Sequence, residues 1–177
     1  MRIIEFKSIE NQYVMNKIEQ LISTLKLLPH PEGGFFKETY RSNLEIRIGE
    51  PYSGKRNIST CIYFLLTSDV FSAFHRIHQD EIWHFYDGSP LLLHIISPKG
   101  EYSCVKIGRK INNGEIPQFV VPAGCWFAAN VLNYEDFTLL GCTVSPGFDF
   151  SDFELANRLS LIQQFPEHKD IITKLTR

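Results

Sequence analysis

The chain has 177 residues, is 44% hydrophobic and 13% aromatic, and carries a formal net charge of -2. This is enough apolar material for one domain with a real core, and the scattered Lys and Arg exclude the concentrated basic face of a typical nucleic-acid-binding protein. The longest apolar runs, such as CIYFLL at 61–66, fall far short of the roughly 20 residues of a membrane span. No signal-peptide core follows the start, so we expect a cytoplasmic protein without a membrane or nucleic-acid partner.

The first predicted element is a helix over residues 11–28. Its apolar residues recur at helical spacing: Val14, Ile18, Leu21, Ile22, Leu25 and Leu28. The sequence PHPEGG at 29–34 ends this helix, because proline removes a backbone donor and glycine permits positive φ.

The middle of the chain has the texture of short strands. Runs rich in Phe, Tyr, Val, Ile and Thr alternate with Gly, Pro, Asn or Asp clusters. We expect strands near 35–41, 58–67, 71–78, 81–87, 91–96, 102–109, 117–121, 125–131 and 137–145. Many short strands at this spacing favour a mainly β fold, a sandwich or a barrel.

A helical pattern returns near the C-terminus. Residues 152–165 carry Phe153, Leu155, Leu159, Ile162 and Phe165, with Ser151 or Asp152 as a candidate cap. A short helix is expected at 167–176. The layout predicts one domain over 1–177, with an N-terminal helical segment (1–28), a β-barrel (29–150) and C-terminal helices (151–177). The four cysteines form no CxxC pair, and we expect buried free thiols.

The stretch FHRIHQDEIWHFYDG at 74–88 is the richest in chemistry. Alternate residues of a strand share a face, so Glu81, Trp83 and Phe85 lie together. If His75 also points inward, it meets Glu81 in a pocket walled by these aromatic rings. Burial among aromatic side chains raises the pKa of a carboxyl group, and a nearby imidazole completes an acid–base pair. His75 and Glu81 are therefore the candidate catalytic residues.

The other histidines of the β region have simpler interpretations. Alternation turns His78 and His84 to the opposite face, where they fit a surface or dimer contact. His94, inside LLLHII at 91–96, fits a hydrogen-bonded strand residue.

A second polar segment is HPEGGFFKETYR at 30–41. Glu32 beside two glycines is not a core residue, and the segment either lines the mouth of the pocket or forms a dimer contact. Lys37 and Arg41 could hold an anionic group of a ligand by charge-assisted hydrogen bonds. Neither a P-loop nor a GxGxxG pattern occurs in the chain, so nucleotide binding through such loops is not predicted.

Several of these segments together resemble one family. Glu81, six residues and Gly88 match the E-x6-G half of the first cupin motif, His75 stands at its first histidine, and VPAGCWFAAN (121–130) is similar to the second motif. With LLPHPEGGFFKETYRS (27–42) and VSPGFDFSDFEL (144–155), the chain resembles the cupin-5 or DUF985 family of RmlC-like cupins. The resemblance implies a double-stranded β-helix, a jelly-roll barrel with a pocket between its sheets, usually as a homodimer. Most members have no assigned function.

The resemblance does not extend to the usual cupin metal ligands. A metal-binding cupin places further histidines near 77 and 127, but Ile77 and Phe127 stand there. A catalytic metal normally has about three protein ligands, so no cofactor is firmly predicted. A divalent metal held by His75, His78 and Glu81 is the alternative.

Three hypotheses for function follow. In the first, the barrel binds a small molecule without a metal, as a sugar-type isomerase or epimerase with His75 as base and Glu81 as its orienter or the acid. Trp83, Phe85 and Phe127 would then be pocket walls. In the second, the chain is a metal-dependent cupin oxygenase or isomerase. In the third, it binds a small molecule without catalysis.

Overall fold

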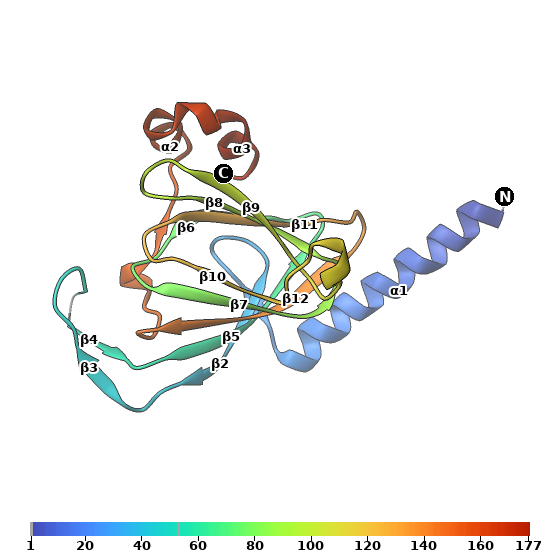
Figure 1. The fold of residues 1–177 in the computed structure, drawn as a ribbon. Helices are drawn as coiled ribbons and strands as arrows, with labels where there is room; N and C mark the ends of the chain where they lie inside the picture. The colour runs from blue at the N-terminus through green and yellow to red at the C-terminus, as the bar shows by residue number, and fades with distance from the viewer. Residues whose placement is uncertain (1, 53) are drawn as a thin grey trace.

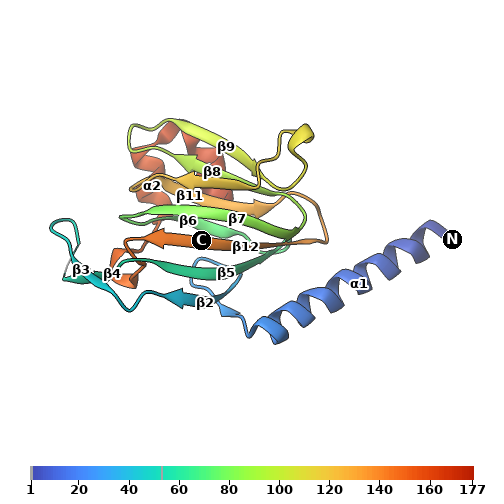
Figure 2. The same cartoon turned by 60° about the horizontal axis from the view of Figure 1, so that its bottom comes forward.

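The computed structural model describes residues 2–52 and 54–177, and most of their strands form two facing antiparallel sheets (Figure 1, Figure 2). The first sheet contains, in spatial order, β1 (Leu28–Pro29), β2 (Phe35–Arg41), β5 (Thr60–Thr67), β12 (Phe137–Ser145), β7 (Asp80–Gly88) and β10 (Gln118–Val121). The second contains β13 (Glu154–Leu155), β6 (Ser72–Arg76), β11 (Trp126–Val131), β8 (Leu91–Ile96) and β9 (Tyr102–Ile107). The mainly β fold predicted from the sequence is confirmed.

A small third sheet projects from the body of the protein. It is a hairpin of β3 (Glu45–Arg47) and β4 (Lys55–Asn57), which extends beyond the end of β2 (Figure 1). The sequence analysis did not predict it, although Leu44, Ile46 and Ile48 alternate with polar residues as in a strand; Leu44 and Ile46 are exposed rather than packed in the core. The edge strands β1 and β13 were missed because they have only two residues each, too few to show a periodic pattern.

The nine strands expected from the sequence are all present, with ends that differ by two residues or fewer. The helices differ more. The first, α1, spans Arg2–Leu25, so it begins earlier than predicted and ends earlier. The helix predicted over 152–165 is wrong in its first half, because a 3-10 turn (Phe150–Asp152) and β13 precede α2 (Arg158–Gln164). Asn157 caps α2 by accepting the Ser160 N–H. A 3-10 turn (Pro166–His168) leads into α3 (Lys169–Lys174).

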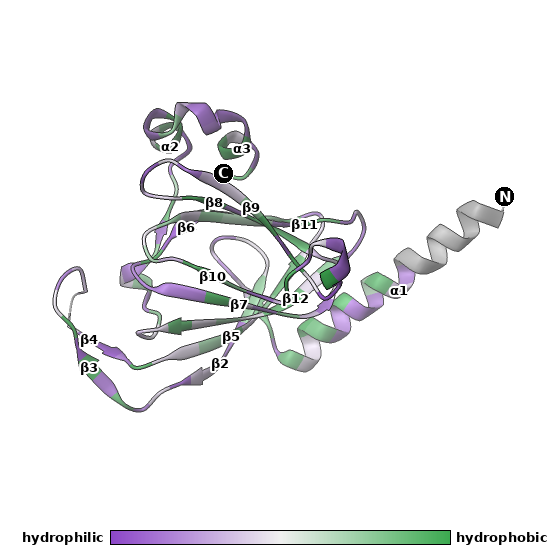
Figure 3. Cartoon of the chain, viewed as in Figure 1, coloured by the Kyte–Doolittle hydropathy of each residue, from purple (hydrophilic) through white to green (hydrophobic). Residues whose placement is uncertain are grey.

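The main core fills the space between the sheets. Strand alternation sends apolar side chains of both sheets inward, and the largest of them are fully buried: Phe64, Leu66, Trp83, Leu93, Phe127 and Leu140. Figure 3 shows hydrophobic residues along the central strands, and a mixture of hydrophilic and hydrophobic residues on the β3–β4 hairpin.

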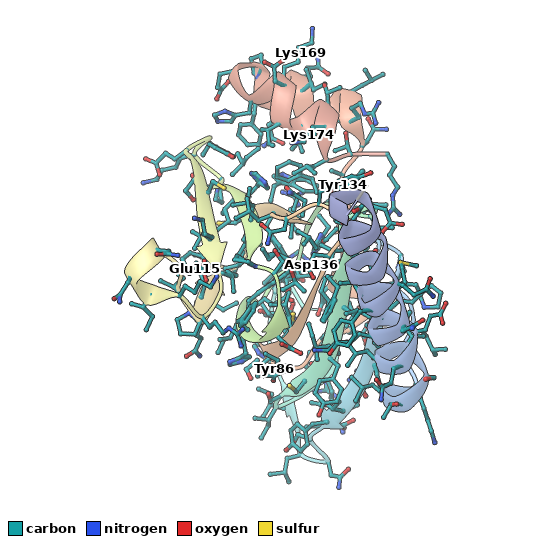
Figure 4. The ribbon with its side chains drawn as sticks, turned by 90° about the vertical axis from the view of Figure 1, so that its right-hand side faces the viewer. Tyr86, Glu115, Tyr134, Asp136, Lys169 and Lys174 are labelled. Atoms are coloured by element: carbon teal, nitrogen blue, oxygen red, sulfur yellow. The ribbon has the colours of Figure 1, made fainter. Side chains whose placement is uncertain are left out.

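Helices cover the outer side of each sheet. The C-terminal helices pack Leu161 and Ile172 against Trp126 on the five-stranded sheet. The second half of α1 packs on Leu65 and Leu139 of the six-stranded sheet, beside the loop that carries Tyr134 and Asp136 (Figure 4). No helix in the described residues is long and apolar enough to span a bilayer. All four cysteines are free, as expected, but only Cys125 and Cys142 are buried; Cys61 is half-buried and Cys104 is exposed.

Candidate functional site

The candidate site is a cavity of about 280 Å³ between the six-stranded sheet, β6 and the segment 148–153. Its polar lining residues are His30, Glu32, Glu38, Arg41, Thr60, His75, Glu81, Cys142 and Asp149. Its apolar lining residues are Phe36, Ile62, Phe64, Ile77, Val144, Phe148, Phe150 and Phe153. It is smaller than the range of roughly 300–1,000 Å³ that is usual for drug-sized ligands.

Strand alternation explains which side chains reach the cavity. On β7, Glu81 faces inward, and the register pairs it with Val144 of β12, another lining residue. Two residues earlier on β12, Cys142 faces the same way. The opposite sheet contributes His75 from β6, followed by Ile77 just beyond the strand. The side chains of His75 and Glu81 therefore both point into the cavity, as strand alternation led us to expect.

His75 has a fixed partner on each ring nitrogen. Its Nδ1 lies 2.7 Å from the Ala73 carbonyl oxygen, and its Nε2 lies 3.0 Å from Oε2 of Glu32. The other Glu32 oxygen, Oε1, accepts the Ser72 hydroxyl at 2.8 Å. Because a carbonyl oxygen can only accept, Nδ1 carries a proton. A second proton then lies between Nε2 of His75 and the Glu32 carboxyl group. The two residues share this proton, and we call them the dyad.

The two glycines after Glu32 place it against β6. Gly33 has φ of 120° and Gly34 has φ of 73°, values that residues with a Cβ rarely adopt. The tight loop is closed by the Gly33 N–H donating to the His30 carbonyl at 3.0 Å. The Glu32 carbonyl accepts the Ala73 N–H at 2.8 Å. The EGG triplet is thus the local reason that a loop carboxyl group lies beside His75.

Glu81 is a second buried carboxyl group in the same cavity. Burial raises its pKa to about 7, while His75 lowers it, Glu32 raises it, and a hydrogen bond from the Cys142 thiol lowers it. Burial likewise raises the pKa of Glu32 and lowers the pKa values of His30 and His75. Two carboxyl groups in unlike surroundings can divide the roles of acid and base.

The residues singled out from the sequence fall into two groups. Glu32, Arg41, His75 and Glu81 line the cavity. The remaining four lie outside its lining: Lys37, Trp83, Phe85 and Phe127. The sequence paired His75 directly with Glu81, whereas the group in contact with its Nε2 is Glu32.

The residues outside the lining have other positions. Trp83 and Phe127 belong to the main core, with the Phe127 ring centroid 4.0 Å from that of His75. Phe85 is half-buried against the same core, and Lys37 is exposed. Of these aromatic residues, Phe127 contacts the ring of His75 directly.

Sequence reasoning missed the aromatic mouth of the cavity, formed by Phe148, Phe150 and Phe153. These residues lie in SPGFDFSDF at 145–153, of which only Phe153 was assigned to the predicted helix, and none of the three phenylalanines was connected with the pocket. His30 was also missed, and its ring lies 4.7 Å from Phe36 and 6.2 Å from Phe150, centroid to centroid.

The arginine at the mouth is fully engaged. Nε and Nη2 of Arg41 donate to the two carboxylate oxygens of Glu38 at 2.9 and 2.7 Å. Nη1 donates to Asn57 Oδ1 at 2.8 Å, and both Nη atoms donate to the Phe148 carbonyl at 3.2 Å. Arg41 therefore ties β2 to the aromatic mouth.

The cupin metal set does not fit this cavity. Ile77 and Phe127 occupy the positions where histidine ligands are expected. His78 is exposed and contacts the Tyr52 ring, with centroids 6.0 Å apart, outside the cavity lining. Within the described residues, no three His, Cys, Asp or Glu side chains are grouped to hold a metal ion.

His84 and His94 are held by other contacts. His84 Nε2 lies 3.1 Å from the Thr143 hydroxyl oxygen. His94 lies 2.8 Å from the Tyr102 hydroxyl through Nδ1 and 3.0 Å from Asn130 Oδ1 through Nε2. The expectation of a hydrogen-bonded strand residue at His94 is confirmed.

Comparison with known proteins places the chain in a family. The model of the cupin superfamily family DUF985 matches residues 19–156. An uncharacterised protein of Saccharomyces cerevisiae, YML079W, is 36% identical over 149 residues, which cover 77% of this chain and 74% of the yeast protein.

Solved structures show the same likeness. A hypothetical protein from Leishmania major is 35% identical with a TM-score of 0.83, covering 89% of this chain and 97% of that one. Protein SO0799 from Shewanella oneidensis is 41% identical with a TM-score of 0.81, covering 90% and 96%. The fold alone is shared with an oxalate decarboxylase variant from Bacillus subtilis. That protein is 15% identical with a TM-score of 0.51, and the match covers 83% of this chain and 36% of that one.

Proposed function

Because this chain belongs to the DUF985 family of the cupin superfamily, with a cavity between its sheets, we propose that it binds a small molecule there and transfers protons on it without a metal. The reaction class is that of a sugar-type isomerase or epimerase. The observation that carries the proposal is the dyad contact, His75 Nε2 to Glu32 Oε2 at 3.0 Å, in one cavity with Glu81, whose pKa is raised to about 7.

The roles follow from the proton inventory. Both nitrogens of His75 are engaged, so the dyad acts as one unit that holds a single transferable proton. Glu81 is about half ionised near pH 7, the condition in which a group both accepts and donates protons well.

In one direction, the Glu81 carboxylate accepts the proton from the carbon next to a ligand carbonyl group. The C–H electron pair forms a C=C bond, and the carbonyl oxygen takes the proton of the dyad, which gives a neutral enediol. In the reverse direction the dyad is the base and Glu81 the acid. To complete an isomerisation, Glu81 returns its proton to the former carbonyl carbon, while the dyad accepts the proton of the hydroxyl group on the other carbon, which becomes the new carbonyl group.

The surrounding groups tune these two acids. The Ala73 carbonyl fixes the proton on Nδ1 of His75, and the Ser72 hydroxyl orients the Glu32 carboxyl group. The Cys142 thiol donates to Glu81, and burial raises the pKa of Cys142 well above its ordinary value. Cys142 is therefore a neutral hydrogen-bond donor rather than a nucleophile.

The test is solvent deuterium exchange into a panel of neutral aldoses and ketoses, followed by proton NMR in D2O. The wild-type chain, after treatment with a chelator, is expected to exchange the hydrogen next to the carbonyl group of at least one sugar. Glu32→Gln and Glu81→Gln are expected to abolish the exchange. Glu115→Gln removes another buried carboxyl group, one that lies outside the cavity (Figure 4), and is expected to retain it. Binding without exchange would instead support the non-catalytic function.

We also propose a cytoplasmic homodimer. Tyr86 lies on the outer side of the six-stranded sheet (Figure 4), is 47% exposed and packs its ring on Tyr63 at 6.1 Å. Such a partly exposed aromatic pair suits a symmetric contact, and free cysteines suit a reducing compartment. Light scattering on the purified chain is expected to give the mass of a dimer, and Tyr86→Arg the mass of a monomer.

A further inference from the structure

We propose that the cavity takes an uncharged, polyhydroxylated ligand of about monosaccharide size and rejects ligands that carry a phosphate or carboxylate group. This inference rests on the proposed function, because it names the ligand class for the same site.

The first support is the charge inventory of the cavity lining. It contains four carboxyl groups, those of Glu32, Glu38, Glu81 and Asp149, and one guanidinium group, that of Arg41. Hydrogen bonds from Ser151 hold the pKa of Asp149 below its ordinary value, so this group is ionised at neutral pH. An anionic ligand would therefore enter a field of its own sign, which weakens its binding.

The second support is the state of Arg41. Its guanidinium has five N–H donors, and Glu38, Asn57 and the Phe148 carbonyl occupy them. A ligand phosphate could hydrogen-bond to Arg41 only by displacing one of these partners. The residue that the sequence offered as an anion anchor is thus already paired.

The other nearby cations also serve the protein itself. Arg56 donates to the Asp152 carboxylate, and Arg177 donates to the carbonyl oxygens of Pro31 and Phe71. Lys37 is exposed, and none of the three lines the cavity. Among the lining residues, the charge-assisted contacts that phosphate binding requires are already used.

The third support is the fit of the remaining surface. Phe36, Phe148 and Phe153 offer apolar faces for the C–H side of a ring, while the deep carboxyl groups and the dyad exchange hydrogen bonds with hydroxyl groups. An ammonium ion could only donate, and so could not accept the protons of the dyad and of Glu81. The volume of about 280 Å³ is too small for a nucleotide-linked sugar, which is itself drug-sized or larger.

The experiment is isothermal titration calorimetry of the full chain at neutral pH with matched probes. The probes are glucose, mannose and fructose, their phosphate monoesters, glucuronate as the carboxylate and glucosamine as the cation. At least one neutral sugar is expected to bind, with its phosphate or carboxylate counterpart at least about tenfold weaker. Equal or tighter binding of an anionic or cationic counterpart would overturn the inference, and so would no binding by any neutral sugar at millimolar concentration.

A variant tests the role of Arg41 separately. Glu38→Gln removes the carboxylate that Arg41 is paired with, so the affinity for sugar phosphates is expected to rise relative to the wild type. The matched control is Glu45→Gln, because Glu45 is ion-paired with Lys55 at 3.2 Å on the hairpin, outside the cavity lining. No gain in Glu38→Gln over this control would contradict the pairing argument.

The two proposals fail in different ways. If a neutral sugar binds but shows no solvent deuterium exchange, the proposed catalysis is contradicted and the proposed ligand class is still supported. If exchange occurs in a sugar phosphate that binds as well as its neutral parent, the proposed ligand class is contradicted and the proposed catalysis is still supported.

Discussion

Glu32 Oε2 lies 3.0 Å from His75 Nε2, with both side chains buried. Two residues far apart in the chain thus share a proton at the base of the cavity, on a loop and on β6. A buried hydrogen-bonded pair of this kind is costly to break, because the partner left behind keeps its desolvation penalty without its contact.

Removing the Glu32 carboxyl group should therefore cost stability as well as activity. Glu32→Ala leaves His75 Nε2 and the Ser72 hydroxyl without their partner, and we expect a loss of about 3 kcal/mol in the free energy of unfolding. Glu32→Gln keeps an acceptor and a donor in place and should cost about 1 kcal/mol. Urea unfolding of the two variants measures this difference, and equal losses would contradict the hydrogen-bonding role.

The Glu81 carboxyl group predicts a specific pH dependence. Its pKa is raised from the ordinary 4.5 to about 7 in the folded chain, so between these values the folded state binds more protons than the unfolded state. The free energy of unfolding contributed by this group therefore falls as the pH rises from 4.5 to 7. Below 4.5 the group is protonated in both states and contributes no pH dependence.

Glu81→Gln removes the cost of burying an ionised carboxylate at this position. The variant and the wild type should have similar stability near pH 4.5, and above pH 7 the variant should be more stable by about 3 kcal/mol. Denaturant unfolding of both proteins across this pH range measures the difference. A variant that is less stable at high pH would show that Glu81 is stabilised as a carboxylate.

The backbone at Gly33 should be far less tolerant of a Cβ than the backbone at Gly114. A Cβ at Gly33 would overlap the Phe71 carbonyl oxygen, whereas a Cβ at Gly114 would have nothing within 4 Å. Both glycines have positive φ, so Gly114→Ala should cost only the conformational strain, about 1 kcal/mol. Gly33→Ala should cost about 3 kcal/mol and displace Glu32 from His75. Unfolding free energies and the deuterium exchange assay report the two effects.

The sequence predicted the parts of the fold and site that depend on local pattern. Alternation correctly placed His75 and Glu81 inward, because the period of a strand is fixed by its geometry. Alternation cannot show which residues of other segments meet across the cavity, so Glu32 was assigned either to the mouth of the pocket or to a dimer contact, and its contact with His75 was not predicted. The helix predicted from 152 begins too early. Phe153 fits the apolar spacing of a helix, but it lies in an irregular segment before α2 and lines the cavity.

The contact between Arg56 and Asp152 holds that irregular segment in place. Nε and Nη2 of Arg56 donate to the two carboxylate oxygens of Asp152 at 2.7 and 2.6 Å, and Gln79 donates to the same carboxylate at 2.7 Å. Arg56 and Asp152 are both buried, and Asp152 lies between Phe150 and Phe153 of the aromatic mouth. The β3–β4 hairpin therefore anchors the mouth through one ion pair.

A double-mutant cycle measures this anchor. Arg56→Ala and Asp152→Ala should each lower the free energy of unfolding by about 3–5 kcal/mol, because each removes the opposite charge from a buried ion pair. Together they should cost clearly less than the sum, which gives a coupling energy of a few kcal/mol. The matched cycle on Lys55 and Glu45, an exposed pair on the same hairpin, should give less than about 1 kcal/mol. Equal coupling in the two cycles would mean that the hairpin does not hold the mouth through Arg56.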